Sequence, residues 1–462
     1  SVSGTSNIGA NITTSGTQTY AGAVTLSGGD RTLTGTTIST QSTLAGGSNA
    51  LTIAGAADID GAYTGLSSLS ITGAANIGAS ITTSGTQSYA GAVTLSGGDR
   101  TLTGATINTQ STLAGGAHAL TIAGAADVDG AYTNLASLNI SGASNIGANV
   151  TTTGTQTYTD AVTVSAASTL SGSALSLAAA VLESGGTGYT LTLSNTDTNS
   201  SITGLVSGAG ALVKAGAGTL TLGASNTYAG TTSVNAGTLK LGHANALGSD
   251  TAGSGTTVGA GASLDLNQLS VTEPVSLAGG RILNGVLAGP MALTADSTIE
   301  ASAGSSLTLS GAITGGFGLT IAGGGTVTLS GNNSFTGQTS VSSGTLKVAH
   351  ANALGSATGA TVVAAGGTLG IMIPPSVPLV IYAVLTQESI GKLFMAAIIP
   401  GLLALLGYLL VIRIVVTLKP EAGPAGARVP TAVALRSLVG VIPILLVFLV
   451  VIVGIYGGWA NP

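Results

Sequence analysis

Two pairs of aspartates are the residues in this sequence whose spacing best fits acid–base or cation-binding chemistry. Asp58 and Asp60 lie two positions apart, and Asp127 and Asp129 repeat this spacing further along the chain. On a β-strand, residues two apart project from the same face, so each pair would bring two carboxylates together. Paired carboxylates can hydrolyse glycosides or bind Ca²⁺. Because the pair is copied with its surroundings and followed by glycine, we interpret it as a solvated turn, since an active site needs one asymmetric set of residues.

The three histidines, His118, His243 and His350, are the other candidates for catalysis. His243 and His350 occupy the same place in two copies of the sequence HANALG, so we expect them to bond within a turn. The sequence contains no GxSxG, HExxH or P-loop motif. It also has no cysteine, which excludes disulfides, cysteine metal sites and a cysteine nucleophile. We therefore predict that the protein is not an enzyme and uses no cofactor or metal.

The composition differs from that of an ordinary soluble domain. Of 462 residues, 73 are Gly, only 6% are charged, and 11 Lys and Arg stand against 16 Asp and Glu. So few basic residues cannot form a nucleic-acid-binding surface, so we predict no nucleic-acid partner. Residues 1–370 are rich in Gly, Ser, Thr and Ala, whereas residues 371–462 contain long runs of Leu, Ile and Val. This change predicts a domain boundary near residue 370.

Internal repeats organise the first part of the chain. The 69-residue period of one repeat is kept by Tyr20, Tyr89 and Tyr158. We divide one repeat into three sub-repeats of similar length, 68–91, 92–115 and 116–136, and expect each to form one coil.

Each sub-repeat carries an apolar–polar–apolar triplet followed by glycine, as in LSITG at 69–73. Such alternation predicts a strand with one buried face, and the glycine permits a corner. One short coil cannot bury its apolar face alone, but stacked coils form a continuous core. The first part is therefore predicted to be an all-β parallel β-solenoid of roughly sixteen coils spaced about 4.8 Å apart.

A second repeat begins near residue 208. The segments GTLTL at 218–222, NTYAG at 226–230 and GTLKL at 237–241 return in closely similar form at 325–329, 333–337 and 344–348. This pattern resembles the passenger-associated transport repeat of bacterial autotransporters. The resemblance covers about 205–370, while 1–204 is predicted to be a solenoid with 69-residue repeats.

The resemblance implies a right-handed β-helix on the surface of a Gram-negative cell, or secreted from it, with host or cell-surface ligands. Neither a signal peptide nor the alternating strands of a translocator barrel are visible, so we do not expect the chain to export itself.

The last part of the chain has the features of a membrane segment. Residues 393–416 carry one charge, Arg413, and residues 438–456 carry none; both stretches are long enough to cross a bilayer. A proline-rich stretch, 371–385, predicts a broken or re-entrant segment. The loop between the two spans contains three basic residues and is therefore predicted to be cytoplasmic. We expect a short pair of transmembrane helices in contact with membrane lipid within 371–462.

Residues 367–382, GTLGIMIPPSVPLVIY, resemble the signature hairpin of the large permease subunit of TRAP transporters, the DctM family. The stretches 388–394, 400–403 and 454–459 are similar to the same family. The resemblance implies sodium-coupled import of C4-dicarboxylates or related organic acids, with a small permease subunit and a periplasmic binding protein as partners. By this resemblance the candidate substrate- and ion-binding residues are Gly370, Pro374, Pro375 and Ser376. The alternative is that these residues only shape a break in a helix.

Two functions follow from these resemblances. The first is a non-catalytic passenger for adhesion or structural display, joined to a membrane fragment. The alternative is the large permease subunit of a TRAP importer. A passenger must cross the outer membrane, whereas permease helices belong to the inner one. We therefore predict that two unrelated coding sequences were joined near 367–371; in the natural-fusion alternative, the inner-membrane helices tether a periplasmic rod.

Overall fold

The computed structural model describes residues 1–249, 255–356, 361–363, 382, 385–386 and 390–418. The chain forms two compact units, one made of Ser1–Phe335 with Ser343–Gly355 and the other of Thr336–Ser342 with Ser356–Pro462. The candidate residues Gly370, Pro374, Pro375 and Ser376 lie outside the described residues.

The first unit consists of short strands throughout. Its N-terminal half contains β1 (Ser6–Ile8), β2 (Ile12–Thr13), β3 (Gln18–Tyr20), β4 (Val24–Leu26), β5 (Arg31–Thr40), β6 (Leu44–Ala45), β7 (Leu51–Ile59), β8 (Tyr63–Leu66), β9 (Leu69–Ile71), β10 (Ala75–Ile77), β11 (Ile81–Thr83), β12 (Gln87–Tyr89), β13 (Val93–Leu95), β14 (Arg100–Thr109), β15 (Leu113–Ala114), β16 (Leu120–Val128), β17 (Tyr132–Leu135), β18 (Leu138–Ile140), β19 (Ser144–Ile146), β20 (Val150–Thr152), β21 (Gln156–Val164), β22 (Ser168–Gly172) and β23 (Leu175–Val181). Its C-terminal half contains β24 (Glu183–Ser184), β25 (Thr187–Gly188), β26 (Leu191–Asn195), β27 (Ser200–Ile202), β28 (Val206–Ser207), β29 (Leu212–Ala215), β30 (Thr219–Leu222), β31 (Thr232–Val234), β32 (Thr238–Leu241), β33 (Thr256–Gly259), β34 (Ser263–Asp265), β35 (Ser270–Val271), β36 (Val275–Ala278), β37 (Arg281–Leu283), β38 (Gly285–Leu287), β39 (Met291–Ala295), β40 (Ser297–Ala301), β41 (Ser306–Leu309), β42 (Ile313–Gly315), β43 (Leu319–Gly323), β44 (Thr326–Leu329) and β46 (Thr345–Val348).

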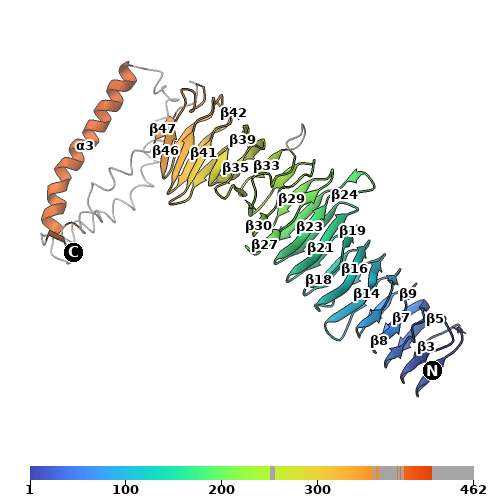
Figure 1. Ribbon diagram of the computed structural model, residues 1–462. Coiled ribbons are helices and arrows are strands. Elements are labelled where there is room, and N and C mark those ends of the chain that lie inside the picture. Colours follow the sequence, from blue (N-terminus) through green and yellow to red (C-terminus); the bar gives the residue numbers. More distant parts are fainter. Residues whose placement is uncertain (250–254, 357–360, 364–381, 383–384, 387–389, 419–462) are drawn as a thin grey trace, which may run out of the picture. The chain divides into compact units, whose positions relative to one another are not determined.

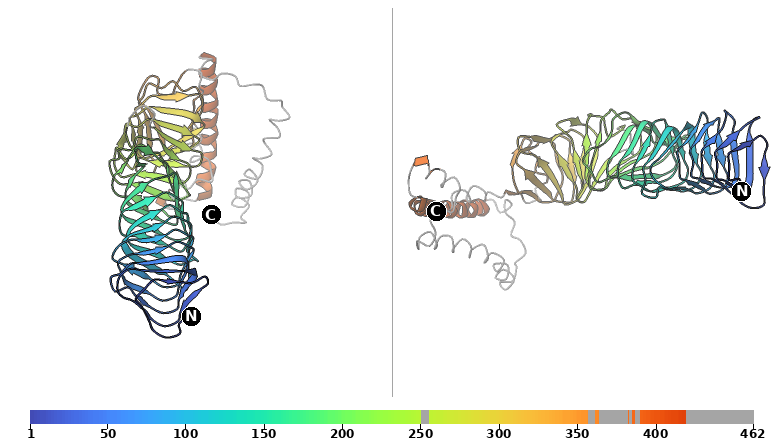
Figure 2. Two further views of the ribbon diagram at one scale, coloured as in Figure 1. Left: turned by 90° about the vertical axis from the view of Figure 1, so that its right-hand side faces the viewer. Right: turned by 90° about the horizontal axis from the view of Figure 1, so that it is seen from below.

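These strands stack in parallel from one coil to the next, so the predicted parallel β-solenoid is confirmed (Figures 1 and 2). The solenoid has about eighteen turns over residues 6–348, slightly more than the roughly sixteen coils predicted from the lengths of the sub-repeats. Among its named strands, β24 and β25 form an antiparallel hairpin that interrupts the parallel order.

Each coil in the N-terminal half has three inward-facing sides. In one coil the inward side chains Ile53, Ile59 and Tyr63 are all fully buried, and polar residues alternate with them. Gly55 forms the corner between the first two sides, with a φ of 150°. A Cβ atom there would lie 1.9 Å from the carbonyl oxygen of Gly35 in the preceding coil, so only glycine fits.

The 69-residue repeat does not contain three whole coils, so the predicted division into coils at 68–91, 92–115 and 116–136 is wrong. Leu51 pairs with Leu69, and Gln87 with Ile107, so a coil closes in fewer residues than the first two sub-repeats contain. Ile53 and Ile122 are equivalent in the repeat, yet Ile122 stacks through Leu102 and Ile81 onto Tyr63. One repeat therefore makes about three and two-thirds turns, and its copies lie on successive sides of the solenoid.

The second unit contains a parallel pair, β45 (Thr339–Val341) and β47 (Thr361–Val363), and the helix α3 (Ile390–Leu418). The predicted segment 393–416 is thus helical. Within the described residues, no helix meets the length and apolarity required of a membrane span. The predicted span 438–456 and its preceding loop lie outside the described residues, as does most of the proline-rich stretch 371–385.

Candidate functional site

The paired aspartates are held in ladders of hydrogen bonds between coils. Asp58 accepts hydrogen bonds from Asn76 Nδ2 at 2.9 Å and Ser39 Oγ at 3.3 Å, one coil to either side. The repeat-equivalent Asp127 accepts from the side-chain amides of Asn108 and Asn145, at 3.0 and 2.8 Å. Both oxygens of each carboxylate are therefore used to join three successive coils. This arrangement favours a structural role over acid–base chemistry.

Burial and the charge of Asp127 affect the ionisation of Asp129, the second aspartate of its pair. Burial, and to a smaller extent the charge of Asp127, raise the pKa of Asp129. Among the described residues, no group of three or more His, Asp and Glu side chains is close enough to hold a metal ion.

The two repeat-equivalent histidines bond within their turns, as predicted. The Nδ1 atom of His243 accepts a hydrogen bond from the backbone N–H of Asn245 at 3.1 Å. His350 makes the same bond with Asn352, also at 3.1 Å. His118 lies in a different turn, where its backbone N–H donates to Gly115 at 2.9 Å.

A set of polar side chains lies inside the solenoid that was not predicted from the sequence. Gln87 is fully buried, its Nε2 donates to the carbonyl of Thr103 at 2.8 Å, and its Oε1 accepts from the Tyr89 hydroxyl at 2.7 Å. The same Gln–Tyr pair recurs at Gln18 with Tyr20 and at Gln156 with Tyr158. The sequence signal was a Gln two positions before each periodic Tyr.

Buried asparagines mark both copies of the second repeat. Asn226 Oδ1 accepts from the Val206 N–H at 2.8 Å, and its Nδ2 donates to the Ala246 carbonyl at 2.6 Å. Asn333, its counterpart in the other copy, makes the equivalent bonds to Ile313 and Ala353 at 2.9 and 2.6 Å. The two copies thus form the same local structure.

Lys214 is a fully buried cation in β29. Its Nζ donates to three backbone carbonyls, those of Ala215 at 2.6 Å, Gly216 at 2.8 Å and Ala236 at 3.2 Å. Burial lowers the pKa of Lys214 to about 8. The lysine therefore joins two coils at a corner by satisfying carbonyls that point inward.

Replacing Lys214 should measure what this corner contributes. Lys214→Met keeps most of the side-chain volume but leaves three carbonyls without their donor, so we expect the free energy of unfolding to fall by about 1–3 kcal/mol. The control Lys240→Met changes an outward-facing residue of β32 and should shift it by no more than about 0.5 kcal/mol. Urea titration followed by circular dichroism distinguishes the two, and equal stabilities would show that the buried bonds contribute nothing.

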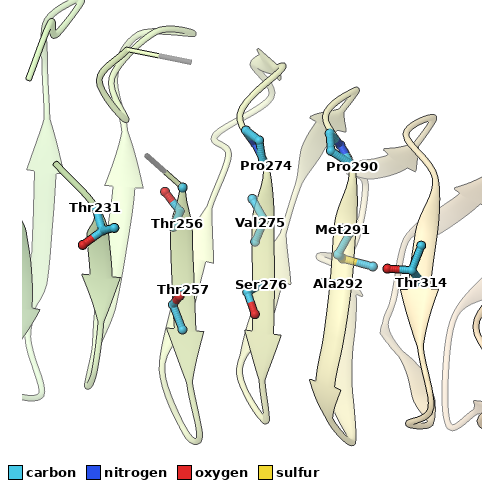
Figure 3. Close-up of a pocket in the computed structure, with 11 residues that line it drawn as sticks. Thr231, Thr256, Thr257, Pro274, Val275, Ser276, Pro290, Met291, Ala292 and Thr314 are labelled. Atoms are coloured by element: carbon cyan, nitrogen blue, oxygen red, sulfur yellow. The ribbon is translucent and has the colours of Figure 1, made fainter. Parts of the chain in front are cut away.

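Shallow depressions mark the outer surface. One of about 300 Å³ crosses several successive strands and is lined by Pro274, Pro290 and Met291 with threonines at both ends (Figure 3). None of its lining residues is titratable. A second, of about 310 Å³, is lined by polar residues that include Asn226 and the buried Glu273. These surfaces can contact a partner, but they do not assemble a nucleophile with a base.

Two family models match the chain. The passenger-associated transport repeat matches residues 212–241, which contain β30, β31 and β32. The tripartite ATP-independent periplasmic transporter, DctM component, matches residues 303–462. The second match begins within the solenoid, because the solenoid strands β41 to β44 and β46 lie inside it. No solved structure matches the chain.

Similar curated proteins fall into the same two groups. The C4-dicarboxylate TRAP transporter large permease protein DctM of Pseudomonas aeruginosa is 41% identical over 104 residues, which are 22% of this chain and 24% of the relative. The isethionate TRAP transporter permease protein DctMQ of Oleidesulfovibrio alaskensis is 60% identical over 52 residues, 11% of this chain and 8% of the relative. The adhesin BmaC autotransporter of Brucella suis biovar 1 is 37% identical over 166 residues, 35% of this chain and 5% of the relative.

The chain therefore spans at most about a quarter of the length of any of these three relatives. Both resemblances inferred from the sequence are confirmed. The protein combines a β-solenoid similar to autotransporter passengers with a C-terminal stretch similar to DctM.

Proposed function

We propose that the solenoid is a non-catalytic passenger that acts in adhesion or structural display on the surface of a Gram-negative cell, as a right-handed coil with host or cell-surface ligands. The observation that carries the proposal is the passenger-associated repeat, whose two copies form the same buried asparagine bonds. Similarity to an adhesin supports it. The bonding of Asp58, Asp127 and Lys214 between coils also fits a rod that presents its surface to ligands.

Surface display can be tested with an epitope inserted between Gly185 and Gly186. Both residues are exposed at the tip of the β24–β25 hairpin, and nothing lies within 4 Å of a Cβ added to either. We expect an antibody to bind the epitope on intact source cells, which supply the export machinery that the chain itself is not expected to provide, and external protease to remove it. A second insertion after Gly304, another open turn, controls for local effects. Detection only after the outer membrane is permeabilised would contradict surface display.

Adhesion requires a second measurement on the same cells. Cells that display the chain should be retained on immobilised host cells more than cells that carry Ile122→Asp, whose solenoid we expect to be destabilised. Equal retention with equal display would argue for structural display without adhesion.

We also infer a second candidate function, that of a membrane segment of a TRAP-type importer, which the DctM match favours. In this proposal α3 lies in the inner membrane; its exposed Leu402, Leu406 and Leu409 suit contact with lipid. The backbone around Gly370, Pro374, Pro375 and Ser376 would line a sodium and organic-acid site, with a small permease and a periplasmic binding protein as partners. Uptake of a labelled C4-dicarboxylate tests this function, and it should be lost in Ser376→Ala if the proposal is right.

Topology tests the membrane placement. The loop 419–436 should face the cytoplasm, because its Lys and Arg residues favour that side. A cysteine placed at Ala425 in this cysteine-free chain should therefore resist a membrane-impermeant thiol reagent in intact spheroplasts. Labelling before lysis would contradict the proposed topology.

We also propose that two unrelated coding sequences were joined, and this can be tested by whether one tryptic peptide is detected. Trypsin would release residues 348–392 as a single peptide that contains the boundary near 367–371. If the joining is an artefact, mass spectrometry of the source cells should not detect this peptide, while it detects 215–240 from the solenoid. Secure detection of 348–392 would instead support a natural fusion in which the helices tether a periplasmic rod.

A further inference from the structure

Asn284 and Gly285 form the only Asn–Gly step in the sequence; Asn284 lies between β37 and β38, and Gly285 is the first residue of β38. An asparagine followed by glycine is the dipeptide most prone to deamidate, because glycine has no side chain to keep its backbone nitrogen away from the asparagine amide carbon. The reaction needs rotation of both residues toward each other. Whether it occurs therefore depends on how the fold holds them.

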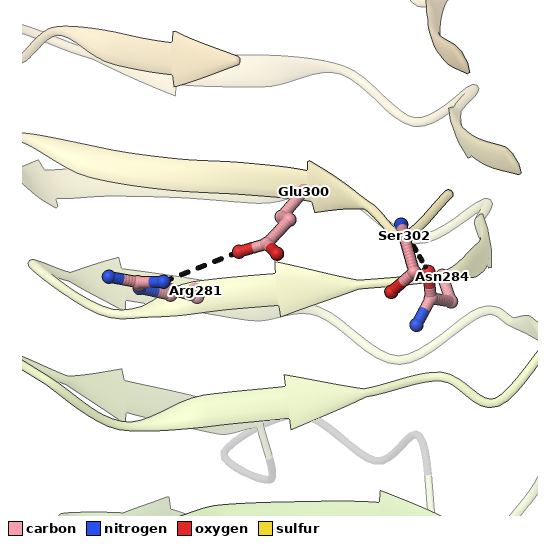
Figure 4. Close-up of polar contacts among 4 residues, drawn as sticks. All are labelled: Arg281, Asn284, Glu300 and Ser302. Carbon is pink, nitrogen blue, oxygen red and sulfur yellow. Dashed lines mark hydrogen bonds and ion pairs between the residues drawn. The ribbon is translucent and has the colours of Figure 1, made fainter. Parts of the chain in front are cut away.

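The fold holds Asn284 at both its side chain and its backbone. Its Oδ1 accepts a hydrogen bond from the Ser302 N–H at 2.9 Å (Figure 4). Its own N–H donates to the Glu300 carbonyl at 3.3 Å. The ion pair between Arg281 and Glu300, at 3.3 Å, joins the same two coils beside it. The φ of Asn284 is 43°, in the left-handed region.

Gly285 is held by close packing against the preceding coil. It is buried, with a φ of 132°. A Cβ atom at this position would lie 2.7 Å from the Leu269 carbonyl oxygen and 2.8 Å from Leu266 Cβ. Rotation of Gly285 toward the side chain of Asn284 therefore has to take place against Leu266 and Leu269, so we expect it to require local opening of the coil.

We propose that Asn284–Gly285 is a deamidation site that the folded solenoid protects and that unfolding exposes. In the reaction the Gly285 nitrogen forms a bond to Asn284 Cγ, the bond from Cγ to the side-chain nitrogen breaks, and ammonia leaves with the proton of the Gly285 amide. Water then opens the succinimide ring at one of its two carbonyls to give aspartate or isoaspartate.

The two products differ in their fit to the fold. Aspartate keeps an oxygen that can accept from the Ser302 N–H. Isoaspartate adds a methylene to the main chain next to Gly285, where a Cβ atom would already lie 2.7 Å from the Leu269 carbonyl oxygen, so we expect it to disturb this packing. A chain that stays unfolded is thus marked covalently, and the isoaspartate form cannot rebuild this coil.

The test compares the full chain, kept folded or unfolded in concentrated urea, during incubation in the same mildly alkaline buffer. Trypsin with a glutamate-specific protease releases residues 282–300, in which mass spectrometry reports deamidation and separates the two products. We expect the folded chain to react at least about tenfold more slowly, because the reaction requires local opening of the coil. Equal rates would overturn the proposal.

Two variants and a control test the proposal further. Asn284→Gln keeps the amide but forms the larger ring far more slowly, so it should remain unmodified in urea. Ser302→Pro removes the N–H that holds Asn284 Oδ1, and should raise the rate in the folded chain. Arg281→Gln, which removes the neighbouring ion pair, is the matched control for general loosening; because it also removes the tryptic site at 281, its deamidation is read in the longer peptide 241–300. If Ser302→Pro does not fold, the comparison of folded and unfolded wild-type chain still decides the proposal.

Discussion

Ile122→Asp should destabilise the solenoid more than any surface change. Ile122 is fully buried in β16, between Leu102 of the preceding coil and Ile140 of the next. An aspartate there either buries a charge without a partner or takes up a proton, and it also leaves a cavity. We expect the free energy of unfolding to fall by about 3–5 kcal/mol, which melting followed by circular dichroism would detect.

The neighbouring residue provides the control. Thr121 faces outward in the same strand, between Thr101 and Asn139. Thr121→Asp adds the same charge to the same coil, and should change the stability by no more than about 1 kcal/mol. If the two variants melt at the same temperature, Ile122 does not face the core as the structure has it.

Local alternation was enough to predict the strands, because each triplet places two apolar side chains on one face. The stretch LTI at 120–122 is such a case, and both apolar residues are buried. Coil length could not be predicted in the same way. It depends on which residue pairs with the next coil, and all three inner sides accept the same apolar residues, so copies such as Ile53 and Ile122 do not reveal that they lie on different sides.

The buried polar residues were missed for a related reason. Alternation places Lys214 and Gln87 inward, but an inward polar residue is stable only when the corner supplies partners. These partners are carbonyls of residues far along the chain, such as Ala236 for Lys214 and Thr103 for Gln87. Repetition was the more useful guide: the turn bonds of His243 and His350 were predicted because both copies of the motif were recognised.

The candidate transport residues were predicted from resemblance to a family and not from repetition within this sequence. Gly370, Pro374, Pro375 and Ser376 were named through resemblance to a family, and the DctM match covers them. Their local sequence predicts a break in the chain's helical structure, whereas a binding site also requires groups from elsewhere in a fold. Their role therefore stays a prediction that the uptake and topology experiments address.

Strongly alkaline solution should unfold the solenoid through its buried tyrosines. Tyr63, Tyr89, Tyr132, Tyr158 and Tyr228 are each at most 1% exposed, and burial raises the pKa of every one of them. In the unfolded chain their pKa is about 10. Above that pH the unfolded state binds fewer protons than the folded state, so the free energy of unfolding falls as pH rises.

This predicts a specific titration curve. Of the ten tyrosines, these five should not ionise near pH 10 while the circular dichroism remains native, and they should ionise together when the fold is lost. Absorbance of tyrosinate measures the ionisation of the tyrosines, and circular dichroism measures the loss of the fold.

Tyr89→Phe removes the donor to Gln87 and should lower the stability at neutral pH by about 1 kcal/mol. The variant's stability should nevertheless fall less steeply as the pH rises. The control Tyr382→Phe changes an exposed residue and should leave the stability at neutral pH unchanged. If all ten tyrosines ionise near pH 10 with the solenoid intact, the five hydroxyls are not held in a dry core, because a buried tyrosinate without a compensating charge would destabilise the coils around it.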